Sequence, residues 1–381
     1  MSTPLDRGLF PVTEHFNYLN HAAVGILPVP TRDALTRFVY AHSTEGISGV
    51  FPYELRLPEY RSAIARYIGA APSEIAILRN TGDGANAIAT GLDWKPGDEI
   101  VLSDNEFPAN AYPWLACRDF GVVVRLIEGP RQRMTPAVLR ANLTKRTRIV
   151  AVSWVAFHDG YRHDLAALAE VAHEFGALLC VDVMQGLGAF RLDVHASGID
   201  AAYGGGAKWL MALQGVSFLY VREGLIERLR LAAPGWRSAQ DMWAFFDYDQ
   251  PLVYDASRFE GGTVNIIGAL SLAESVRVLD EPGDAVAKHV LMLTDRLCDG
   301  LHRVGGAITT TRQAGISSGI VTFNMPACDP IALGKILQQE RIVTTYRSNG
   351  IRVSPHGYNT EAEIDHLVET TARAVPVLAT A

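Results

Sequence analysis

Two polar residues at the ends of apolar segments, Asp182 and Lys208, could perform chemistry together. Asp182 ends the run Leu178 to Val181, which is typical of a buried strand in a parallel sheet. Lys208 follows three glycines and precedes Trp209, an apolar setting in which burial would lower its pKa. An acid that keeps a pyridine nitrogen protonated and a lysine that forms a Schiff base are the protein half of pyridoxal-phosphate chemistry. A buried structural aspartate and a surface lysine would explain these residues equally well.

The whole chain sets the limits for any function. It has 381 residues, of which 48% are hydrophobic and 20% charged, with a formal net charge of −7. This length suits two domains, or one large and one small. The mild acidity disfavours binding to nucleic acid or to an anionic membrane. Because no run approaches about eighteen uncharged apolar residues, we expect no transmembrane helix, and the N-terminus does not resemble a signal peptide.

The four cysteines are scattered along the chain and form neither a C-x-x-C motif nor a regular framework. We therefore expect reduced thiols in a cytoplasmic protein. We expect no metal site. The cysteines are Cys117, Cys180, Cys298 and Cys328.

Strand-like and helix-like segments alternate from residue 76 to residue 221, which predicts an α/β fold with a doubly wound, mainly parallel sheet. Helices are expected at 58–68, at 135–143 with Pro136 in its first turn, and at 164–176, and another near Arg32 would be capped by Thr31. Strands are expected before residue 80 and at 100–104, 121–128, 148–157, 178–182 and 216–221. The edge formed by the carboxyl ends of such strands is where open α/β sheets bind ligands.

A glycine-rich turn between a strand and a helix, NTGDGAN at 80–86, offers an anion site. The backbone N–H groups of Thr81, Gly82, Asp83 and Gly84 would converge at the start of the helix, where a phosphate can bind. The glycine spacing fits neither a P-loop nor a dinucleotide fingerprint. A plain helix-capping turn is the alternative.

The pattern changes after residue 262. Segments such as SGIVTFNM and IRVSP predict antiparallel strands beside helices, and hence a smaller α+β domain. We expect an N-terminal arm at 1–20 that packs on this small domain, a large domain at 21–262 and the small domain at 263–381. Residues 235–262 lack clear periodicity and are expected to form a loop over the site.

Seven short stretches together resemble a known family. The chain is similar to fold-type I pyridoxal-phosphate enzymes of the class V aminotransferase family, which includes cysteine desulfurases, kynureninases and isopenicillin-N-epimerase-like proteins. The resemblance implies a seven-stranded, mainly parallel sheet in a large cofactor-binding domain, an amino-acid substrate and a homodimer with shared active sites. The stretches, in the order of the family, are YLNHAAVG (18–25), NTGDGAN (80–86), EFPANAYPW (106–114), VDVMQGLG (181–188), GGGAKW (204–209), RFEGGTVN (258–265) and IRVSPHGYNTEAEID (351–365).

The resemblance also assigns cofactor-binding roles. It implies that Lys208 forms the Schiff base and moves protons at the substrate α-carbon, while Asp182 pairs with the pyridine nitrogen. Gln185 would hydrogen-bond the phenolic oxygen, and Phe107 would stack on the ring, although a packed aromatic at a strand end is an equal alternative. The phosphate would lie on Gly82 and Asp83, with Thr263 arriving from a second subunit.

Four residues are expected to bind the substrate. Arg352 would hold the α-carboxylate by a bidentate contact, and Arg347 would assist or face solvent. Asn20 and His21 follow a short strand-like pair and would face the ligand, but a hydrogen-bonded structural histidine is the more frequent case.

Departures from the family pattern bear on the reaction. Ala207 stands where many members have histidine, and Phe157 and His158 lie where desulfurases carry asparagine. The segment ERIVTTYRSNGIR has no cysteine, although desulfurases place their nucleophile upstream of the carboxylate-binding arginine. We therefore expect β-elimination of the C–S lyase type or epimerisation, with transamination as the alternative. From other classes, a nucleotide-binding oxidoreductase and a catalytically inactive binding protein remain open.

Overall fold

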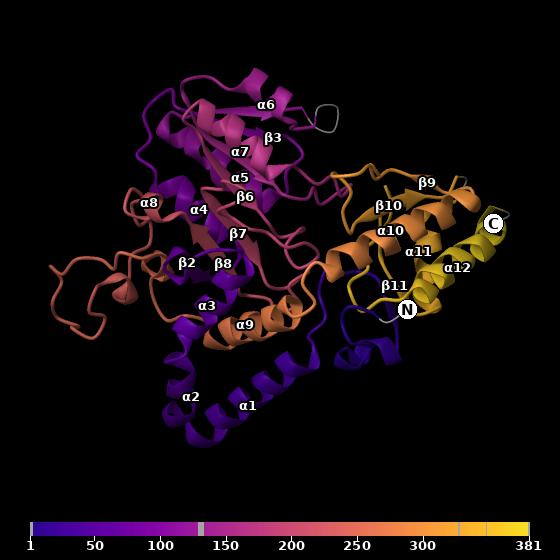
Figure 1. The fold of residues 1–381 in the computed structure, drawn as a ribbon, viewed down its shortest axis with the longest axis horizontal. Helices are drawn as coiled ribbons and strands as arrows, with labels where there is room; N and C mark the ends of the chain where they lie inside the picture. Colours follow the sequence, from indigo (N-terminus) through magenta and orange to yellow (C-terminus); the bar gives the residue numbers. More distant parts are fainter. Residues whose placement is uncertain (1–2, 129–132, 327, 348, 380–381) are drawn as a thin grey trace.

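The structure, a computed structural model, describes residues 3–128, 133–326, 328–347 and 349–379. The chain forms a larger half around a seven-stranded sheet and a smaller half around an antiparallel sheet, and the two halves lie side by side (Figure 1). The predicted α/β fold, with a mainly parallel seven-stranded sheet and a smaller α+β part, is confirmed.

The large sheet is parallel except at one strand. β8 runs antiparallel to both of its neighbours, and the remaining adjacent pairs are parallel. In spatial order the strands are β2 (Ile75–Leu78), β8 (Ser217–Val221), β7 (Ala201–Gly205), β6 (Leu178–Asp182), β5 (Thr147–Ser153), β3 (Glu99–Ser103) and β4 (Val123–Ile127).

Alternate residues of each strand enter the cores on opposite faces of the large sheet. In β6, Leu179 and Val181 belong to one core cluster and Cys180 to the other. Side chains alternate across a sheet, so strands covered on both faces read as continuous apolar runs. This is why the sequence marks β6 as a run of apolar residues that ends in Asp182.

Helices cover both faces of the large sheet. One face is covered by α4, α5 and α8, and the other by α1, α3, α6, α7 and α9. Their bounds, with α2 included, are α1 (Val29–Glu45), α2 (Ile47–Glu54), α3 (Leu57–Tyr67), α4 (Thr81–Gly91), α5 (Pro108–Ala116), α6 (Pro136–Asn142), α7 (Leu165–Glu174), α8 (Glu223–Ile226) and α9 (Ile266–Asp280).

The smaller half has its own core and its own sheet. The antiparallel sheet has the order β12-β13-β10-β9, and a separate two-stranded parallel sheet joins β1 to β11. The elements are β1 (Asn17–Tyr18), α10 (Ala285–Arg303), β9 (Ala307–Ile308), β10 (Val321–Asn324), α11 (Pro330–Gln339), β11 (Ile342–Val343), β12 (Thr345–Arg347), β13 (Gly350–Val353) and α12 (Glu361–Ala379).

The N-terminal segment is tied to the smaller half. Arg7 forms an ion pair with Glu363 at 3.0 Å, and the ring of Phe10 stacks on Tyr358 with centroids 4.2 Å apart. Leu19 lies in the core of the smaller half. These contacts hold the N-terminal segment against the C-terminal part of the chain.

Helix α9 follows the expected boundary at residue 262, yet it packs against α1 and α3 of the larger half. Its Ser275 hydroxyl lies 2.9 Å from that of Thr31 in α1. We therefore propose that the larger half extends through α9 and that the smaller half begins with α10.

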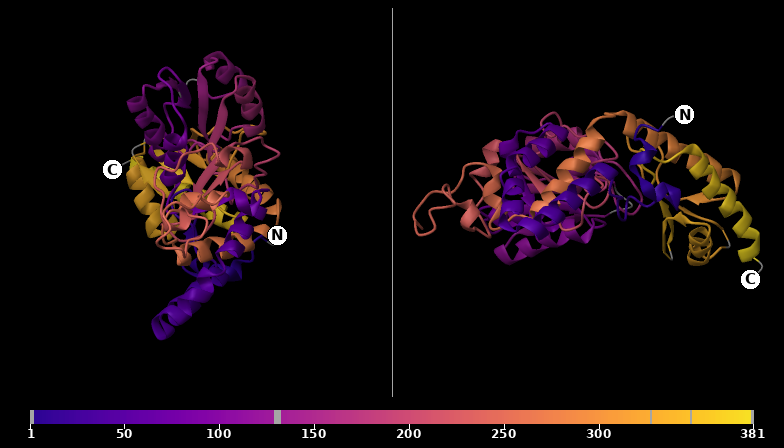
Figure 2. Two further views of the ribbon diagram at one scale, coloured as in Figure 1. Left: turned by 90° about the vertical axis from the view of Figure 1, so that its left-hand side faces the viewer. Right: turned by 90° about the horizontal axis from the view of Figure 1, so that it is seen from below.

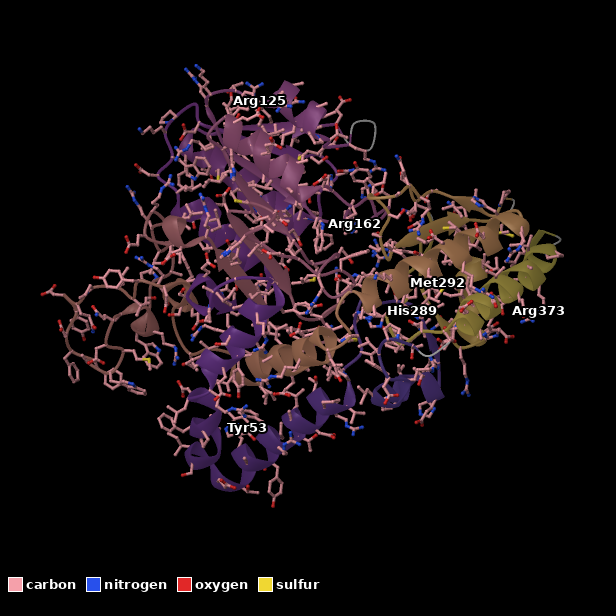
Figure 3. All side chains as sticks on the ribbon, in the orientation of Figure 1. Tyr53, Arg125, Arg162, His289, Met292 and Arg373 are labelled. Carbon is pink, nitrogen blue, oxygen red and sulfur yellow. The ribbon has the colours of Figure 1, made fainter. Side chains whose placement is uncertain are left out.

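Arg162 lies where the two halves meet (Figure 3). Its backbone N–H donates to the carbonyl oxygen of Ile316 in the smaller half at 2.9 Å. Its guanidinium lies 4.5 Å from the ring centroid of Phe190 in the larger half. The hydrogen bond and the packing connect the halves beside the sheet edge.

Two local expectations are wrong. Helix α1 begins at Val29, three residues before the predicted start, and Thr31 bonds to Ser275 instead of capping the helix. Residues 235–262 were expected to form a loop over the site, but none of them lines the cavity at Lys208 within the same chain. The middle of this segment projects beyond the far end of the larger half (Figure 2). Glycine, proline and aspartate residues in this segment predict a loop, but they do not predict which side of the molecule the loop lies on.

Candidate active site

Asp182 occupies the carboxyl end of β6, in the middle of the large sheet. It lies in register with Ser153 of β5 and Tyr203 of β7. The side chain is buried, and its Oδ1 accepts a hydrogen bond from the Met184 N–H at 2.8 Å. Burial raises the pKa of Asp182 to about 7, with a further contribution from the carboxylate of Glu106. The carboxyl group therefore sits at the sheet edge that was predicted to bind a ligand.

Lys208 lies in the turn that follows β7. Burial lowers the pKa of its amine to about 8, the charge of Asp182 opposes this shift, and that of Arg352 adds to it. Gly25 packs against the backbone of the turn, because a Cβ there would lie 1.9 Å from the carbonyl oxygen of Lys208. Its N–H also donates to the carbonyl oxygen of Ala207 at 2.7 Å. An amine with a lowered pKa is a better nucleophile and base near neutral pH.

Phe107 faces Lys208 across a cavity of about 350 Å³. The Nζ atom of Lys208 lies 5.4 Å from the centroid of the Phe107 ring. Phe107 is the N-cap residue of α5, four residues beyond the end of β3. It is 41% exposed, and its ring packs edge-on to Phe157 with centroids 5.3 Å apart. Its ring is therefore available for stacking.

Gln185 also lines this cavity, but protein groups already occupy part of its amide. Its Nε2 donates to the carbonyl oxygen of Ala22 at 3.1 Å, and its Oε1 accepts from the indole N–H of Trp209 at 2.9 Å. These bonds fix the orientation of the amide. One N–H of the amide remains for a ligand oxygen.

The first turn of α4 lies beside the carboxyl end of β7, the strand that precedes Lys208. At Asp83 the turn follows the alternative of a helix cap, because its N–H donates to the side chain of Asn80 at 2.9 Å and is not available to a ligand. The Oγ1 of Thr81 is buried without a hydrogen-bond partner, and a Cβ on Gly205 would lie 3.6 Å from it. The sequence assigned Thr81 only a backbone contact, so the hydroxyl is a further candidate for the phosphate.

Gly82 and Asp83 do not line the Lys208 cavity. The carboxylate of Asp83 pairs with Arg79 at 2.8 Å and borders a different cavity, which Thr263 also lines. Within one chain, Thr263 is therefore separate from Lys208. This position suits the expectation that Thr263 serves a second subunit, which stays a prediction.

Arg352 and Arg347 both line the Lys208 cavity. The Nη1 of Arg352 donates to the carbonyl oxygen of Phe157 at 3.0 Å, and its Nε is buried without a partner. Burial, together with the charge of Arg347, lowers the pKa of Arg352 to about 10. The guanidinium remains charged at neutral pH and retains donors for a carboxylate.

Asn20 and His21 do not line the cavity. The Oδ1 of Asn20 accepts a hydrogen bond from the Thr345 hydroxyl at 2.7 Å, so Asn20 positions a residue of the cavity wall. His21 is fully buried, and its Nε2 lies 2.7 Å from the Tyr358 hydroxyl. Because His21 is fully buried, the prediction that it contacts the substrate is wrong. The structure agrees with the alternative, a structural histidine held by a hydrogen bond.

The sequence did not identify a buried network beside Asp182. Glu106 accepts hydrogen bonds from the backbone N–H of Ser153 at 2.8 Å and from its hydroxyl, and also from Asn110 at 3.0 Å. Asn110 in turn accepts from the Tyr203 hydroxyl at 2.6 Å. Burial raises the pKa of Glu106. An acidic residue directly before Phe107 was the available signal, but the cross-strand contacts that give it a role are not visible in sequence.

His158 is a second residue of the cavity without an assigned role. Burial lowers its pKa, so the ring is neutral at pH 7, and its Nδ1 is buried without a partner. Among the described residues, no group of histidine, cysteine, aspartate or glutamate side chains could hold a metal ion. The cavity is thus built from a lysine, arginines, aromatic rings and hydroxyls.

Three observations fit pyridoxal phosphate. A lysine with a lowered pKa faces an exposed aromatic ring, and a buried carboxyl group couples electrostatically to that lysine. A buried threonine hydroxyl without a partner lies at a helix N-terminus, which is a preferred site for phosphate. Lys208, Asp182, Phe107 and the first turn of α4 would hold the group.

Comparisons with known proteins agree with this arrangement. The sequence model of the family described as aminotransferase class-V matches residues 17–367. A probable cysteine desulfurase of Methanothermobacter thermautotrophicus is 28% identical to this chain, and the alignment covers 97% of each protein.

Two solved structures with 25% sequence identity are also similar. The apo structure of the cysteine desulfurase from Thermococcus onnurineus NA1 has a TM-score of 0.89 and covers 98% of both chains. A lysine-to-alanine variant of C-DES, with glycine covalently linked to its pyridoxal-phosphate cofactor, has a TM-score of 0.86 and covers 96% of this chain and 99% of its own. No helix of the described residues is long and apolar enough to cross a membrane.

Proposed function

The chain belongs to the class-V aminotransferase family, and on that premise we propose that it acts at the α-carbon of an amino acid by β-elimination or epimerisation, without a catalytic cysteine. It is a pyridoxal-phosphate-dependent enzyme. One observation supports the proposed site above the others: Lys208, with a pKa lowered to about 8, is coupled to the buried Asp182 and shares its cavity with Arg352.

Each residue has a task that follows from its position. When bound, pyridoxal phosphate supplies an electron sink that allows the α-proton to leave. Asp182 would hold a proton on the ring nitrogen, and Phe107 would stack on the ring. Lys208 would anchor the group, and its amine would remove and return the proton at the substrate α-carbon. Arg352 orients the substrate by its α-carboxylate.

The phosphate is assigned to the first turn of α4, with Gly82 and the hydroxyl of Thr81 as donors. The buried Thr81 Oγ1 without a partner supports this assignment. The backbone N–H groups of a first helical turn lack intrahelical partners and favour an anion. The N–H of Asp83 is excluded because it caps the helix through Asn80.

Cysteine placement favours elimination or epimerisation over sulfur transfer through the protein. None of the four cysteines lines the Lys208 cavity as described. Cys117, Cys180 and Cys298 are buried, and burial raises the pKa of each thiol. Cys328 is partly exposed, but its Sγ lies 3.9 Å from the carbonyl oxygen of Val375 in α12. A persulfide carrier needs an accessible thiolate near the substrate.

Transamination is the alternative within the family, since the same lysine, aspartate and arginine would serve it. An oxidoreductase that binds nucleotides lacks support, because the first turn of α4 carries no dinucleotide fingerprint. A binding protein without catalysis would require Lys208 to be unused, and its lowered pKa argues against that.

We also propose a cytoplasmic homodimer. Exposed aromatic side chains cluster on the 236–254 loop, with Phe246 90% and Tyr248 85% exposed. Apolar patches of this kind are typical of protein interfaces. A dimer would bring Thr263 of one subunit to the phosphate of the other. Four free thiols suit a reducing compartment.

The test combines three measurements on the purified enzyme loaded with pyridoxal phosphate. Amino acids are screened for α-proton exchange in deuterated water, for pyruvate release and for a keto acid formed at the expense of the cofactor. Exchange with pyruvate supports elimination, and exchange with racemisation supports epimerisation. A stoichiometric amino transfer to a keto acid would replace both with transamination.

A further inference from the structure

The hairpin of β12 and β13 presents a row of polar side chains to the Lys208 cavity. Arg352 lies directly opposite Thr345 on one side and Thr322 on the other. Arg347 is two residues beyond Thr345, so its side chain emerges on the same face of the sheet. All four residues line the cavity. The two arginines are diagonal neighbours, with a Cα separation of roughly 7–8 Å.

The charged side chains that line this cavity are all cationic. They are Lys208, Arg347 and Arg352, and no carboxylate is among its described lining residues. Arg347 lowers the pKa of Arg352, and Arg352 in turn lowers that of Lys208. Arg352 thus lies between two like charges, and anionic groups of a ligand would relieve the repulsion that it experiences.

A single α-carboxylate leaves one arginine without a partner. Arg352 is the more buried of the two, and its orientation is fixed by the Phe157 carbonyl. Arg347 stands at the more exposed end of the row, next to Asn349 in the cavity wall. The positive charge of Arg347 disfavours the charged form of Arg352 and contributes to its lowered pKa. An amino acid with an acidic side chain carries two separate anionic groups, so each arginine could bind one of them.

We propose that the substrate is a small amino acid whose side chain carries a second anionic group, a carboxylate or a sulfinate, and that Arg347 binds this group while Arg352 holds the α-carboxylate. This inference rests on the proposed function, since it places the α-carbon at Lys208. The cavity of about 350 Å³ has to hold the cofactor ring as well as the substrate, so the room that remains suits a short side chain. Arg347 is thereby a specificity-determining residue.

The experiment compares amino acids that are nearly identical in shape and differ in charge. The enzyme loaded with pyridoxal phosphate is titrated with L-aspartate and L-asparagine, with L-glutamate and L-glutamine, and with L-cysteine sulfinate, and the visible absorption change gives each Kd. We expect at least one acid to bind ten or more times more tightly than its amide. We expect the variant Arg347→Gln to reduce this preference to near one.

A matched variant separates the local contact from total charge. Arg118→Gln removes one exposed positive charge outside the cavity, and it should keep the preference for acids. If amides bind as tightly as acids, or if Arg347→Gln keeps the full preference, the inference is overturned. If no amino acid of either kind perturbs the absorption, the proposed function itself fails, which is a different result.

Discussion

The Nζ of Lys208 lies 5.4 Å from the centroid of the Phe107 ring, and the two residues follow strands that are not neighbours in the sheet. Lys208 follows β7 and Phe107 follows β3, with β6 and β5 between them. Asp182 ends β6, one of the two intervening strands, and its charge acts on Lys208. The cation, the ring and the carboxyl group thus come from the same edge of the sheet, and the role of each is tested below.

Replacing Lys208 by alanine should abolish the covalent link to the cofactor. The reason is that Lys208 is the lysine that lines the cavity beside Phe107. The measurement is borohydride reduction followed by peptide mapping, with Lys288→Ala as a control on a helix of the smaller half. If another lysine of the wild-type protein carried the label, the assignment of Lys208 as the Schiff-base lysine would be wrong.

Replacing Asp182 by asparagine should leave the cofactor bound but slow α-proton exchange by at least a hundredfold. Asparagine keeps the shape of the side chain but cannot hold a proton on the ring nitrogen, so the electron sink is weakened. Exchange rates in deuterated water at saturating substrate provide the measurement. Turnover equal to that of the wild type would exclude the pyridinium role.

The rate at which the apo protein takes up pyridoxal phosphate should rise with pH, with a midpoint at about 8, because only the neutral amine of Lys208 can attack. The carboxylate of Asp182 favours the ammonium form, so Asp182→Asn should shift the midpoint to lower pH. The charge of Arg352 disfavours that form, so Arg352→Gln should shift it to higher pH. Stopped-flow absorbance against pH is the measurement.

Asp93→Asn serves as the control for these pH profiles, because it removes an exposed carboxylate that pairs with Arg230. Its midpoint should match that of the wild type. Shifts of equal sign in the Asp182 and Arg352 variants would contradict the electrostatic coupling between these residues and Lys208.

Replacing Arg352 by alanine should raise KM for amino acids by ten- to a hundredfold and remove the preference for a free α-carboxylate. Each tenfold corresponds to about 1.4 kcal/mol. The comparison is between an amino acid and its α-amide in the wild type and the variant. Unaltered kinetics would place the carboxylate on Arg347 instead.

Replacing all four cysteines by serine should retain α-proton exchange and any elimination activity in a protein that keeps its native circular dichroism spectrum. The cavity contains no thiol among its described lining residues, so no step requires one. Assays for pyruvate and for protein-bound sulfane sulfur provide the readout. A stoichiometric persulfide on one cysteine, together with loss of activity when that cysteine is replaced, would show that the enzyme is a desulfurase.

The variant Cys328→Ser isolates the most exposed thiol. It perturbs no buried strand, so it separates a chemical role from a loss of packing. Full activity in this variant is expected even if the quadruple variant is less stable. Loss of sulfane sulfur in this variant alone would identify Cys328 as the carrier.

The sequence by itself determined the sheet and the two central residues of the site. Strands covered on both faces read as apolar runs, and a carboxylate at the end of such a run, or a lysine shortly after one, is expected at the carboxyl edge. Local patterns therefore indicated the positions of Asp182 and Lys208, whereas the roles of Phe107 and Arg352 came from the resemblance to the class V family. Arg352 lies inside β13 of the antiparallel sheet and not at the end of a strand of the large sheet.

Only the tertiary structure decided how these residues are partnered. The amide of Gln185 is held by Ala22 and Trp209, His21 is buried on Tyr358, and Glu106 connects Ser153 to Asn110. Such contacts join segments far apart in the chain, and neither side-chain periodicity nor turn composition reports which segments meet. The direction of the 236–254 loop and the register that places Arg347 beside Arg352 depend in the same way on packing and strand pairing, which act across space.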